Sequence, residues 1–188
     1  MRAWAASPPV RAFRDALLAV ILLLPAWSAS VWAQGIGTDA AAKAKLLGTL
    51  VRFVQWPAGT FAGDEVPLRL CVMHQSAAVE AAFAAHHGGT LSGRRVVVAM
   101  NLAADAPACH VLVVDDSAAR AGVAALARLA GSATLVVGSG DGFLATGGMV
   151  ELINVNDRYR FDIDLRALRE ANLVINPGVL KLARQVRN

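Results

Sequence analysis

The feature that most constrains the fold is a series of short apolar segments that alternate with segments of helical spacing. Valine-rich segments favour strands, and strands that are apolar on both faces are typical of a parallel sheet covered by helices. The predicted strands are residues 66–73, 94–100, 109–116 and 133–138, and the helices between them are residues 75–87 and 117–130. This alternation predicts an α/β fold, a three-layer sandwich with helices on both faces of a mostly parallel sheet.

After residue 148 the continuous apolar runs give way to alternation of apolar and charged residues. Residues 149–155 and 158–164 are separated by Asn156-Asp157, a pair that favours a tight turn. We therefore expect a C-terminal antiparallel hairpin with one solvated face. The inward set is Tyr159, Phe161 and Ile163, and the outward set is Arg158, Arg160 and Asp162.

Two of the expected helices can be assigned ends and faces. Helical spacing over residues 39–55 predicts a helix with Asp39 as its N-cap, and Trp56-Pro57 should end it because proline disfavours a helical residue before it. A second helix, 117–130, should bury one stripe. That stripe is Val123, Leu126, Ala127 and Ala130.

The first 33 residues have the pattern of a secretory signal peptide. Three arginines precede the uninterrupted apolar run 16–26, and Val31 and Ala33 supply the small residues of a cleavage site. The run is too short to span a bilayer as a helix, although an uncleaved anchor is the alternative. Cleavage leaves residues 34–188, a length that suits a single domain.

The charge balance argues against nucleic acid as a partner. Removing the three arginines and one aspartate of the signal peptide lowers the net charge from +4 to +2. No block of basic residues remains in the predicted mature chain.

Both cysteines, Cys71 and Cys109, lie in the part of the chain that is expected to be exported. Two cysteines in an oxidising compartment predict one disulfide, and two buried free thiols are the alternative. Structural stabilisation is the expected role of the bond, with a regulatory switch as the second possibility.

The usual signs of an enzyme, metal site or cofactor site are absent from the sequence. Neighbouring residues on a strand point to opposite faces, so Cys109 and His110 do not converge on one ion. The glycine-rich segment 138–142 lacks the third glycine of a dinucleotide loop and the lysine of a phosphate loop. We therefore expect no catalysis, no bound metal and no cofactor.

Five segments, taken in order, resemble the YfiR family of exported bacterial proteins. They are KAKLLGTLVRFVQWP (43–57), LRLCVM (68–73), CHVLVV (109–114), GFLATGGMVEL (142–152) and RFDIDLRALREANLVINPGVLKLAR (160–184). They resemble, in turn, the opening helix that ends in Trp-Pro, the first strand, a strand that begins with cysteine, a Gly-Phe-x-x-x-Gly-Gly-Met signature, and the closing strand and helix. The resemblance covers almost all of the predicted mature chain.

The resemblance implies regulation. Family members are periplasmic α/β proteins, and the best understood type binds the periplasmic sensor domain of an inner-membrane diguanylate cyclase and holds it inactive, which lowers cyclic di-GMP and biofilm formation. An OmpA-like outer-membrane lipoprotein can sequester such a repressor, and we also expect a homodimer. The alternative is a periplasmic small-ligand-binding sensor that serves another membrane signalling protein. Redox-regulated members have further cysteines near the Gly-Gly-Met signature, and this chain has none there.

The signature segment holds only one group that titrates near neutral pH, Glu151, so we expect its role to be architectural. Gly147 and Gly148 should make the turn that reverses the chain into the hairpin, because a positive φ is cheap only for glycine. Phe143 and Met149 should anchor that turn in the core.

Two surfaces are candidates for the partner contact. The first combines Arg160 and Asp162 of the last strand with Leu168 of the following helix, which would be either an exposed anchor or part of the core. If this surface is not used, the contact should lie at the end of the first helix, around Phe53, Trp56 and Phe61.

Overall fold

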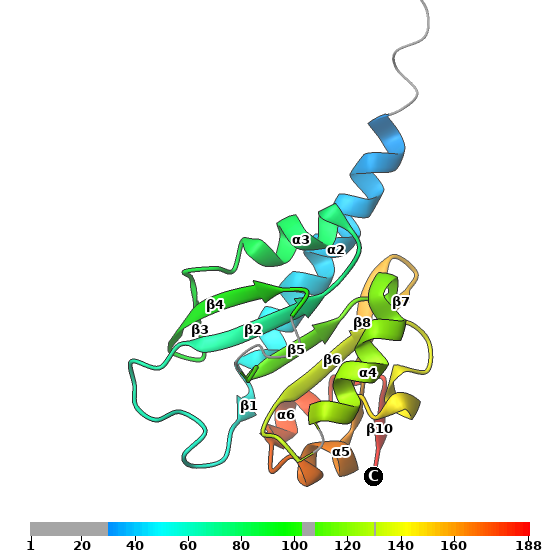
Figure 1. Ribbon diagram of the computed structural model, residues 1–188. Helices are drawn as coiled ribbons and strands as arrows, with labels where there is room; N and C mark the ends of the chain where they lie inside the picture. The colour runs from blue at the N-terminus through cyan, green and yellow to red at the C-terminus, as the bar shows by residue number, and fades with distance from the viewer. Residues whose placement is uncertain (1–29, 103–107, 130) are drawn as a thin grey trace, which may run out of the picture. The chain divides into compact units, whose positions relative to one another are not determined.

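Strand β5 lies near the centre of an eight-stranded sheet (Figure 1). The computed structural model describes residues 30–102, 108–129 and 131–188, and residues 36–188 form one packing unit. The strand order is β10-β8-β7-β6-β5-β2-β4-β3. The bounds are β2 Leu68–Met73, β3 Thr90–Leu91, β4 Arg94–Met100, β5 Val111–Val114, β6 Leu135–Ser139, β7 Val150–Val155, β8 Arg158–Asp164 and β10 Gln185–Arg187.

The five strands β4, β2, β5, β6 and β7 are parallel neighbours, and β3, β8 and β10 run the other way. From β2 the chain passes through α3 to β4, which lies next to β2 in the strand order. From β5 it passes through α4 to β6, which lies next to β5 in the opposite direction. Strands with helical crossovers on both sides make a doubly wound sheet, and the order reverses between β2 and β5.

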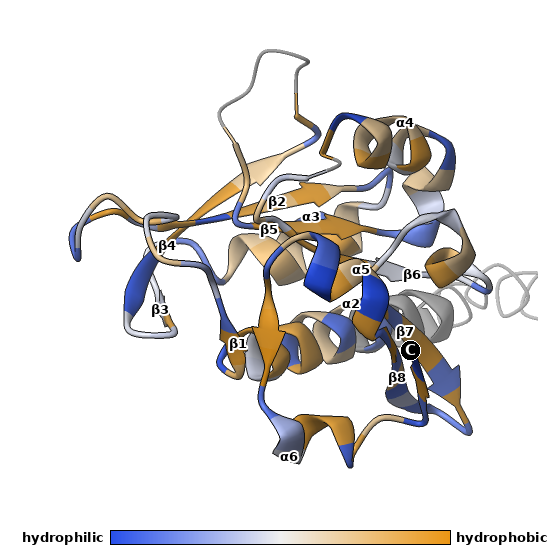
Figure 2. Cartoon of the chain, turned by 90° about the horizontal axis from the view of Figure 1, so that it is seen from below, coloured by the Kyte–Doolittle hydropathy of each residue, from blue (hydrophilic) through white to orange (hydrophobic). Residues whose placement is uncertain are grey.

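Helices cover both faces of the sheet. Their bounds are α2 Ser30–Val51, α3 Ala77–Ala84, α4 Ala119–Leu129, α5 Leu165–Glu170 and α6 Pro177–Leu180, with short 3₁₀ turns η1 Asp116–Ala118 and η2 Phe143–Thr146. Figure 2, seen from below, places α4 above the sheet and α2 below it. The strands between them are apolar, and Leu68, Leu70, Val111, Leu112 and Leu135 are fully buried. The predicted fold class is confirmed.

The expected hairpin is present as β7 and β8, whose antiparallel register pairs Val155 with Arg158. Asn156 and Asp157 both have a positive φ, which is the backbone shape of a tight two-residue turn. The reversal therefore lies at these two residues. The expectation that Gly147 and Gly148 reverse the chain is wrong, because β7 pairs with β6 in parallel and still belongs to the parallel sheet.

Helix α2 differs from its prediction at both ends. It begins at Ser30, so Asp39 lies within the helix and is not its N-cap. It ends at Val51, and Val54–Gln55 form the short strand β1, which pairs with β9 (Val174–Ile175) in a separate two-stranded antiparallel sheet. The predicted signal peptide lies outside the described residues, apart from its last four residues at the start of α2.

Helix α4 is rotated relative to the predicted stripe. Its buried residues are Gly122, Ala125 and Leu126, whereas Val123 is 49% exposed. The cause is Gly122, because a Cβ at this position would lie 2.2 Å from Cγ1 of Val114. The missing side chain lets the helix backbone approach β5, which turns Val123 toward solvent. Ala130, the fourth residue of the predicted stripe, lies outside the described residues.

Candidate functional site

The carboxyl end of β5 carries a network of charged and polar side chains, which we call the carboxyl-end network: Asp39 and Lys43 of α2, Asp115, Asp116 and Ser139. Lys43 Nζ lies 3.1 Å from Asp115 Oδ2, 3.2 Å from Asp116 Oδ1 and 3.3 Å from Asp39 Oδ2. Lys43 and Asp115 are both buried. This end of the sheet, next to the point where the strand order reverses, is where doubly wound proteins usually bind ligands.

In this protein one lysine at that position pairs with three aspartates. Burial acts to lower the pKa of Lys43, but its hydrogen bond to Asp115 and the nearby negative charges raise it well above its usual range. Burial acts to raise the pKa of Asp115, but the Ser117 hydroxyl and Lys43 hold it below its usual range. Both side chains therefore stay ionised and paired, and the Lys43 side chain occupies the place of a ligand.

One side chain beside the network has no partner. His74 follows β2 directly and is buried, and neither of its ring nitrogens makes a hydrogen bond within the described residues. Its backbone N–H is satisfied by Asn101 Oδ1 at 2.9 Å. In those same residues, no three His, Cys, Asp or Glu side chains gather where a metal ion could bind.

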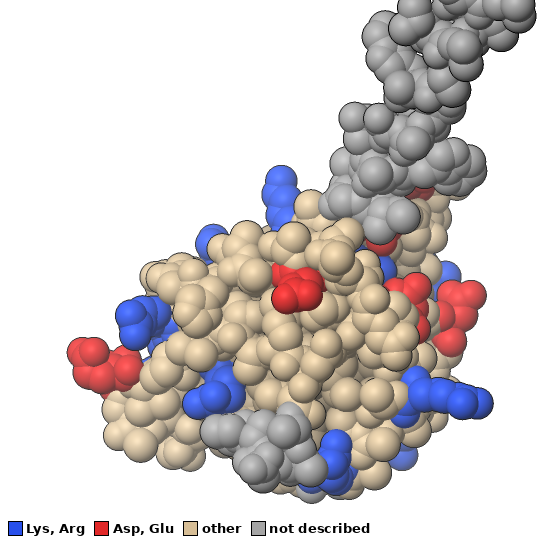
Figure 3. Space-filling model, turned by 45° about the horizontal axis from the view of Figure 1, so that its top comes forward, with Lys and Arg blue, Asp and Glu red and all other residues tan. Residues whose placement is uncertain are grey.

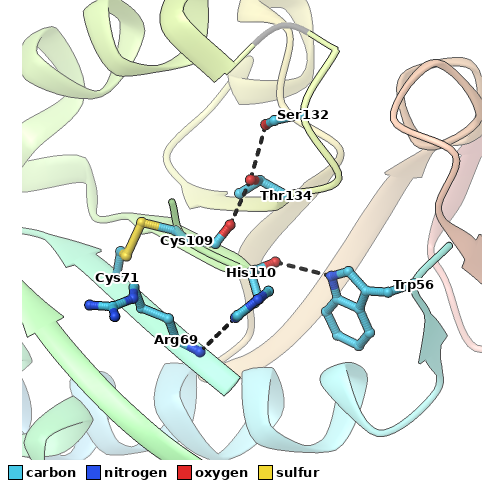
Figure 4. Close-up of a disulfide and its surroundings, with 7 residues drawn as sticks. All are labelled: Trp56, Arg69, Cys71, Cys109, His110, Ser132 and Thr134. Atoms are coloured by element: carbon cyan, nitrogen blue, oxygen red, sulfur yellow. Dashed lines mark hydrogen bonds between the residues drawn. A yellow bond between two sulfur atoms is a disulfide. The ribbon is translucent and has the colours of Figure 1, made fainter. Parts of the chain in front are cut away.

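The amino end of β5 holds the disulfide between Cys71 and Cys109 (Figure 4), as the sequence predicted. It joins β2 to the residues that precede β5, with a Cα–Cα distance of 5.9 Å. The carbonyl of Cys109 accepts a hydrogen bond from Thr134 Oγ1 at 2.7 Å, so the bonded segment is also tied to the start of β6. The bond therefore fixes three neighbouring strands at one end.

Next to the disulfide lies a group of aromatic and cationic side chains, which we call the amino-end cluster: Trp56, Phe61, Arg94 and His110. The indole of Trp56 donates a hydrogen bond to the carbonyl of His110 at 3.3 Å (Figure 4). Phe61 stacks on the His110 ring with centroids 4.4 Å apart, and the Arg94 guanidinium lies 4.1 Å from the Phe61 centroid. Trp56, Phe61 and Arg94 of this cluster line a small open pocket of about 220 Å³. Its other lining residues are Val54, Gln55, Leu68 and Ser92.

The small β1–β9 sheet adjoins this cluster and has an exposed apolar face. Val54 and Ile175 pair with each other and are buried, so their neighbours Phe53 and Val174 point away from the core. Phe53 is 42% exposed and Val174 is 57% exposed. Leu182, just after α6, is 67% exposed. Phe53 and Trp56 flank β1 on either side, which links the exposed face to the amino-end cluster.

The glycines of the signature make room for one aromatic ring. A Cβ at Gly148 would lie 2.2 Å from the Phe143 ring, and one at Gly138 would lie 2.5 Å from the same ring. The buried Glu151 carboxylate accepts the backbone N–H groups of Gly142 at 2.9 Å and Leu144 at 3.2 Å.

Of the signature residues, Phe143 and Met149 are buried, and Gly147 has a φ of 98°. These contacts support an architectural role for the signature. It anchors η2 and the tight connection between two parallel strands.

The first predicted partner surface is not supported. Asp162 is buried and paired with the Arg184 guanidinium, and Leu168 is buried. The exposure expected for Asp162 is wrong because Arg184, which directly precedes β10, lies against its carboxylate, with Arg184 Nε 3.0 Å from Asp162 Oδ1. Arg160 is exposed, as expected. The structure thus leaves the second surface, around Phe53, Trp56 and Phe61, as the stronger candidate.

Several residues of these sites could not be assigned to them from the sequence. Lys43 pairs with an aspartate that is 72 residues away, and Arg94 packs on an aromatic ring from a distant loop. Val174 belongs to a strand of two residues, which is too short to show any periodicity. His110 was considered only as a metal ligand, although the adjacent Cys109 was a clue to its position.

The comparisons with known proteins agree with this description. Comparison with curated proteins finds no match. Within the described residues, every helix is too short or too polar to cross a membrane. The family model described as YfiR/HmsC-like matches residues 40–184, which include both cysteines and the signature segment. Proteins of this kind are periplasmic regulators connected with diguanylate cyclase signalling. Because the match spans most of its length, the chain belongs to the YfiR/HmsC-like family.

Proposed function

We propose that this protein is a periplasmic repressor that binds the periplasmic sensor domain of an inner-membrane diguanylate cyclase. Repression would lower cyclic di-GMP and biofilm formation. Family membership supports a regulatory role. The observation on this chain that carries the proposal is the exposed apolar face of the β1–β9 sheet, with Phe53 and Val174 pointing outward.

An exposed phenylalanine beside an exposed valine suits a protein contact better than open solvent. Large aromatic side chains anchor interfaces when a partner removes them from water, and polar groups around them set the orientation. Arg52 precedes Phe53 and is exposed, so a charged group is available at the edge of the patch. Figure 3 shows acidic and basic side chains mixed over one face of the molecule, which argues against a broad electrostatic contact on that face.

A small-ligand sensor is the second candidate function. The pocket of the amino-end cluster, with two aromatic rings and Arg94, is the feature that favours it. Its volume of about 220 Å³ is smaller than that of most ligand sites, which begin at about 300 Å³. Three other hollows of the described residues are larger, at about 330, 440 and 600 Å³, but none is lined by Phe, Trp or Tyr. We therefore rank the protein contact above ligand binding, and we expect no enzymatic turnover of cyclic di-GMP by the purified protein.

The proposal includes export and assembly. We infer that residues 1–33 are removed as a signal peptide, that an OmpA-like outer-membrane lipoprotein can compete for the protein, and that the protein is a homodimer. N-terminal sequencing of periplasmic material and light scattering of the purified protein test the first and third points. A full-length product held in the membrane, or a monomer at micromolar concentration, would contradict them.

The function can be tested in the native host. Deletion of the gene should raise cellular cyclic di-GMP, and a plasmid copy of the wild type should lower it again. A Phe53→Asp/Val174→Asp copy should fail to lower it, because both substitutions place charge on the proposed contact face. Cyclic di-GMP is measured by mass spectrometry of cell extracts, and the amount of each variant in the periplasm is checked by immunoblot.

The matched control is Val123→Asp, which places the same charge on an exposed valine of α4. It should restore repression fully, and all three purified proteins should melt within a few degrees of one another. The proposal fails if deletion leaves cyclic di-GMP unchanged, or if the double variant represses as well as the wild type.

A further inference from the structure

His110 is held in its neutral form by a backbone hydrogen bond. Its Nδ1 accepts the N–H of Arg69 at 2.9 Å (Figure 4), and a ring nitrogen that accepts a hydrogen bond carries no proton. The ring proton of neutral His110 therefore lies on Nε2. Protonation would place a proton on Nδ1 as well, where it faces the Arg69 N–H and removes this hydrogen bond.

The His110 ring also supports the loop that follows β1. We call residues 57–67 the aromatic loop. Its Phe61 stacks on His110, and Arg94 covers Phe61 and donates hydrogen bonds to the carbonyls of Gly63 at 2.7 Å and Val66 at 3.1 Å. The loop is thus held to the sheet by one imidazole and one guanidinium, with no buried apolar side chain of its own.

The positively charged groups around His110 disfavour a positive charge on its ring. Burial, followed by the positive charges of Arg69 on β2 and Arg94 on β4, lowers the pKa of His110 below its ordinary value, and only the Thr60 carbonyl acts in the opposite direction. Of the two acids of the loop, Asp64 is fully exposed and lies 3.7 Å from Arg94, and Glu65 is exposed as well. Trp56 of this cluster is uncharged.

The sign of the pH effect follows from this direction. Because the folded protein binds the His110 proton less readily than the unfolded chain does, the group stabilises the fold above its ordinary pKa of about 6.5. That contribution is lost as the pH falls from there through the folded pKa. The loss is local to the amino-end cluster, because the disulfide still holds β2 to the segment before β5.

We propose that His110 is an acid-sensitive latch, whose protonation releases the aromatic loop from the amino end of the sheet. The effect on repression rests on the proposed function, since β1 lies between Trp56 and the exposed Phe53. Release of the loop, which begins directly after Trp56, would free the segment that follows β1 and would change the contact face when the periplasm is acidified.

The latch itself can be tested on the purified protein by nuclear magnetic resonance. Between about pH 7.5 and about pH 5, the Arg69 amide should lose protection from hydrogen exchange, after correction for the intrinsic rate, with the same midpoint as the His110 ring. The aromatic resonances of Phe61 and Trp56 should shift with that midpoint. An Arg69 amide that stays protected while His110 titrates overturns the proposal.

Three variants assign the transition to His110. In His110→Asn the side-chain oxygen replaces Nδ1 as a neutral acceptor, so the Arg69 amide should stay protected at every pH. His87→Asn is the matched control, because His87 Nδ1 also accepts a backbone N–H, from Val98 at 3.2 Å, at an exposed position. It should leave the transition unchanged. If His110→Asn does not fold, Arg69→Gln serves instead, and removing this positive charge should move the midpoint to higher pH.

The regulatory consequence has a separate readout. In the native host, the difference in cyclic di-GMP between cultures at about pH 7.5 and about pH 5.5 should disappear in His110→Asn and remain in His87→Asn. A difference that persists in His110→Asn overturns the regulatory part. If the Phe53→Asp/Val174→Asp variant represses normally while the resonance transition is present, the proposed contact face is wrong and the latch stands as a property of the fold.

Discussion

At its carboxyl end β5 leads into Asp115 and Asp116, whose charges are paired with Lys43, whereas at its amino end it is preceded by Cys109 and His110, which face aromatic rings. The first end is closed by its own side chains, and the second is covered only by a loop. In a doubly wound sheet the carboxyl end is the usual place for a ligand. Here Lys43 lies at that place, and the surface that we propose for recognition lies near the other end.

The two ends also differ in how they respond to their surroundings. The pairing at Lys43 keeps its charges fixed over the physiological range, since the pKa of Lys43 is raised and that of Asp115 is lowered. At the amino end, the disulfide and His110 are groups that change with redox state and with pH. The carboxyl end therefore keeps a fixed charge state, whereas the amino end holds the groups that can change.

The largest effect is expected from breaking the carboxyl-end network. Lys43→Met removes the only cation beside Asp115 in the described network and leaves that carboxylate buried and unpaired. Removal of one partner from a buried ion pair costs about 3–5 kcal/mol. Urea denaturation of the purified protein measures this loss.

Lys45→Met is the control, since Lys45 lies on the exposed face of the same helix. It should change the free energy of unfolding by less than about 0.5 kcal/mol. Equal, small effects of the two substitutions would show that the ion pair between Lys43 and Asp115 does not stabilise the fold. The contrast between the two ends of β5 would then be lost.

The second effect, at the amino end, is smaller. Cys71→Ala/Cys109→Ala opens a loop closed over 38 residues, which the chain-entropy model values at about 4 kcal/mol, with typical measured values of about 2–4 kcal/mol. Thermal melts of the double variant and of the reduced wild type should agree. A reduced wild type that melts at the oxidised temperature would show that the bond adds no stability.

The third effect concerns the signature beside the carboxyl end. Gly148→Ala places a Cβ 2.2 Å from the Phe143 ring, and overpacking of this kind costs about 1–3 kcal/mol. Gly63→Ala is the control, because nothing lies within 4 Å of a Cβ there and its φ is not positive. Chemical denaturation should separate the two variants. A Gly148→Ala protein as stable as Gly63→Ala would mean that the Phe143 ring moves freely.

The sequence predicts the centre of the sheet well because its strands are mostly apolar runs, and residues 94–100 match β4 at both ends. The prediction fails for residues whose burial depends on a segment that is distant in the sequence or on the packing of a neighbouring residue. Asp162 looks like a solvent-facing residue of an alternating strand, but it is buried and paired with Arg184, which lies 22 residues further along the chain. Val123 looks like part of an apolar stripe, and only the absence of a side chain at Gly122 turns it outward.

The sites follow the same rule. Cys71 and Cys109 could be paired from the sequence because the chain has only two cysteines. Phe53, Trp56 and Phe61 could be proposed because they are close together in the chain. Lys43 could not, since helical spacing predicts which face of α2 is buried but not which strand end that face meets. A lysine within an apolar stripe is the one signal that was available.

The smallest effect tests the outer edge of the carboxyl-end network, where Tyr159 donates a hydrogen bond to Asp39. Burial and this hydrogen bond raise the pKa of Tyr159 to about 12, so its contribution to stability is complete below about pH 10 and is lost as the pH rises through about 12.

Tyr159 is the only tyrosine of the chain, so phenolate absorbance reports it alone. Asp39→Ala should move the midpoint toward the ordinary value, and Asp141→Ala, at an exposed position, should not. Circular dichroism recorded alongside confirms that the fold persists through the titration. Because Asp39 is partly exposed, the free energy of unfolding should change by only about 1 kcal/mol. A folded wild type that titrates near pH 10 would show that the network ends at Lys43 and does not reach β8.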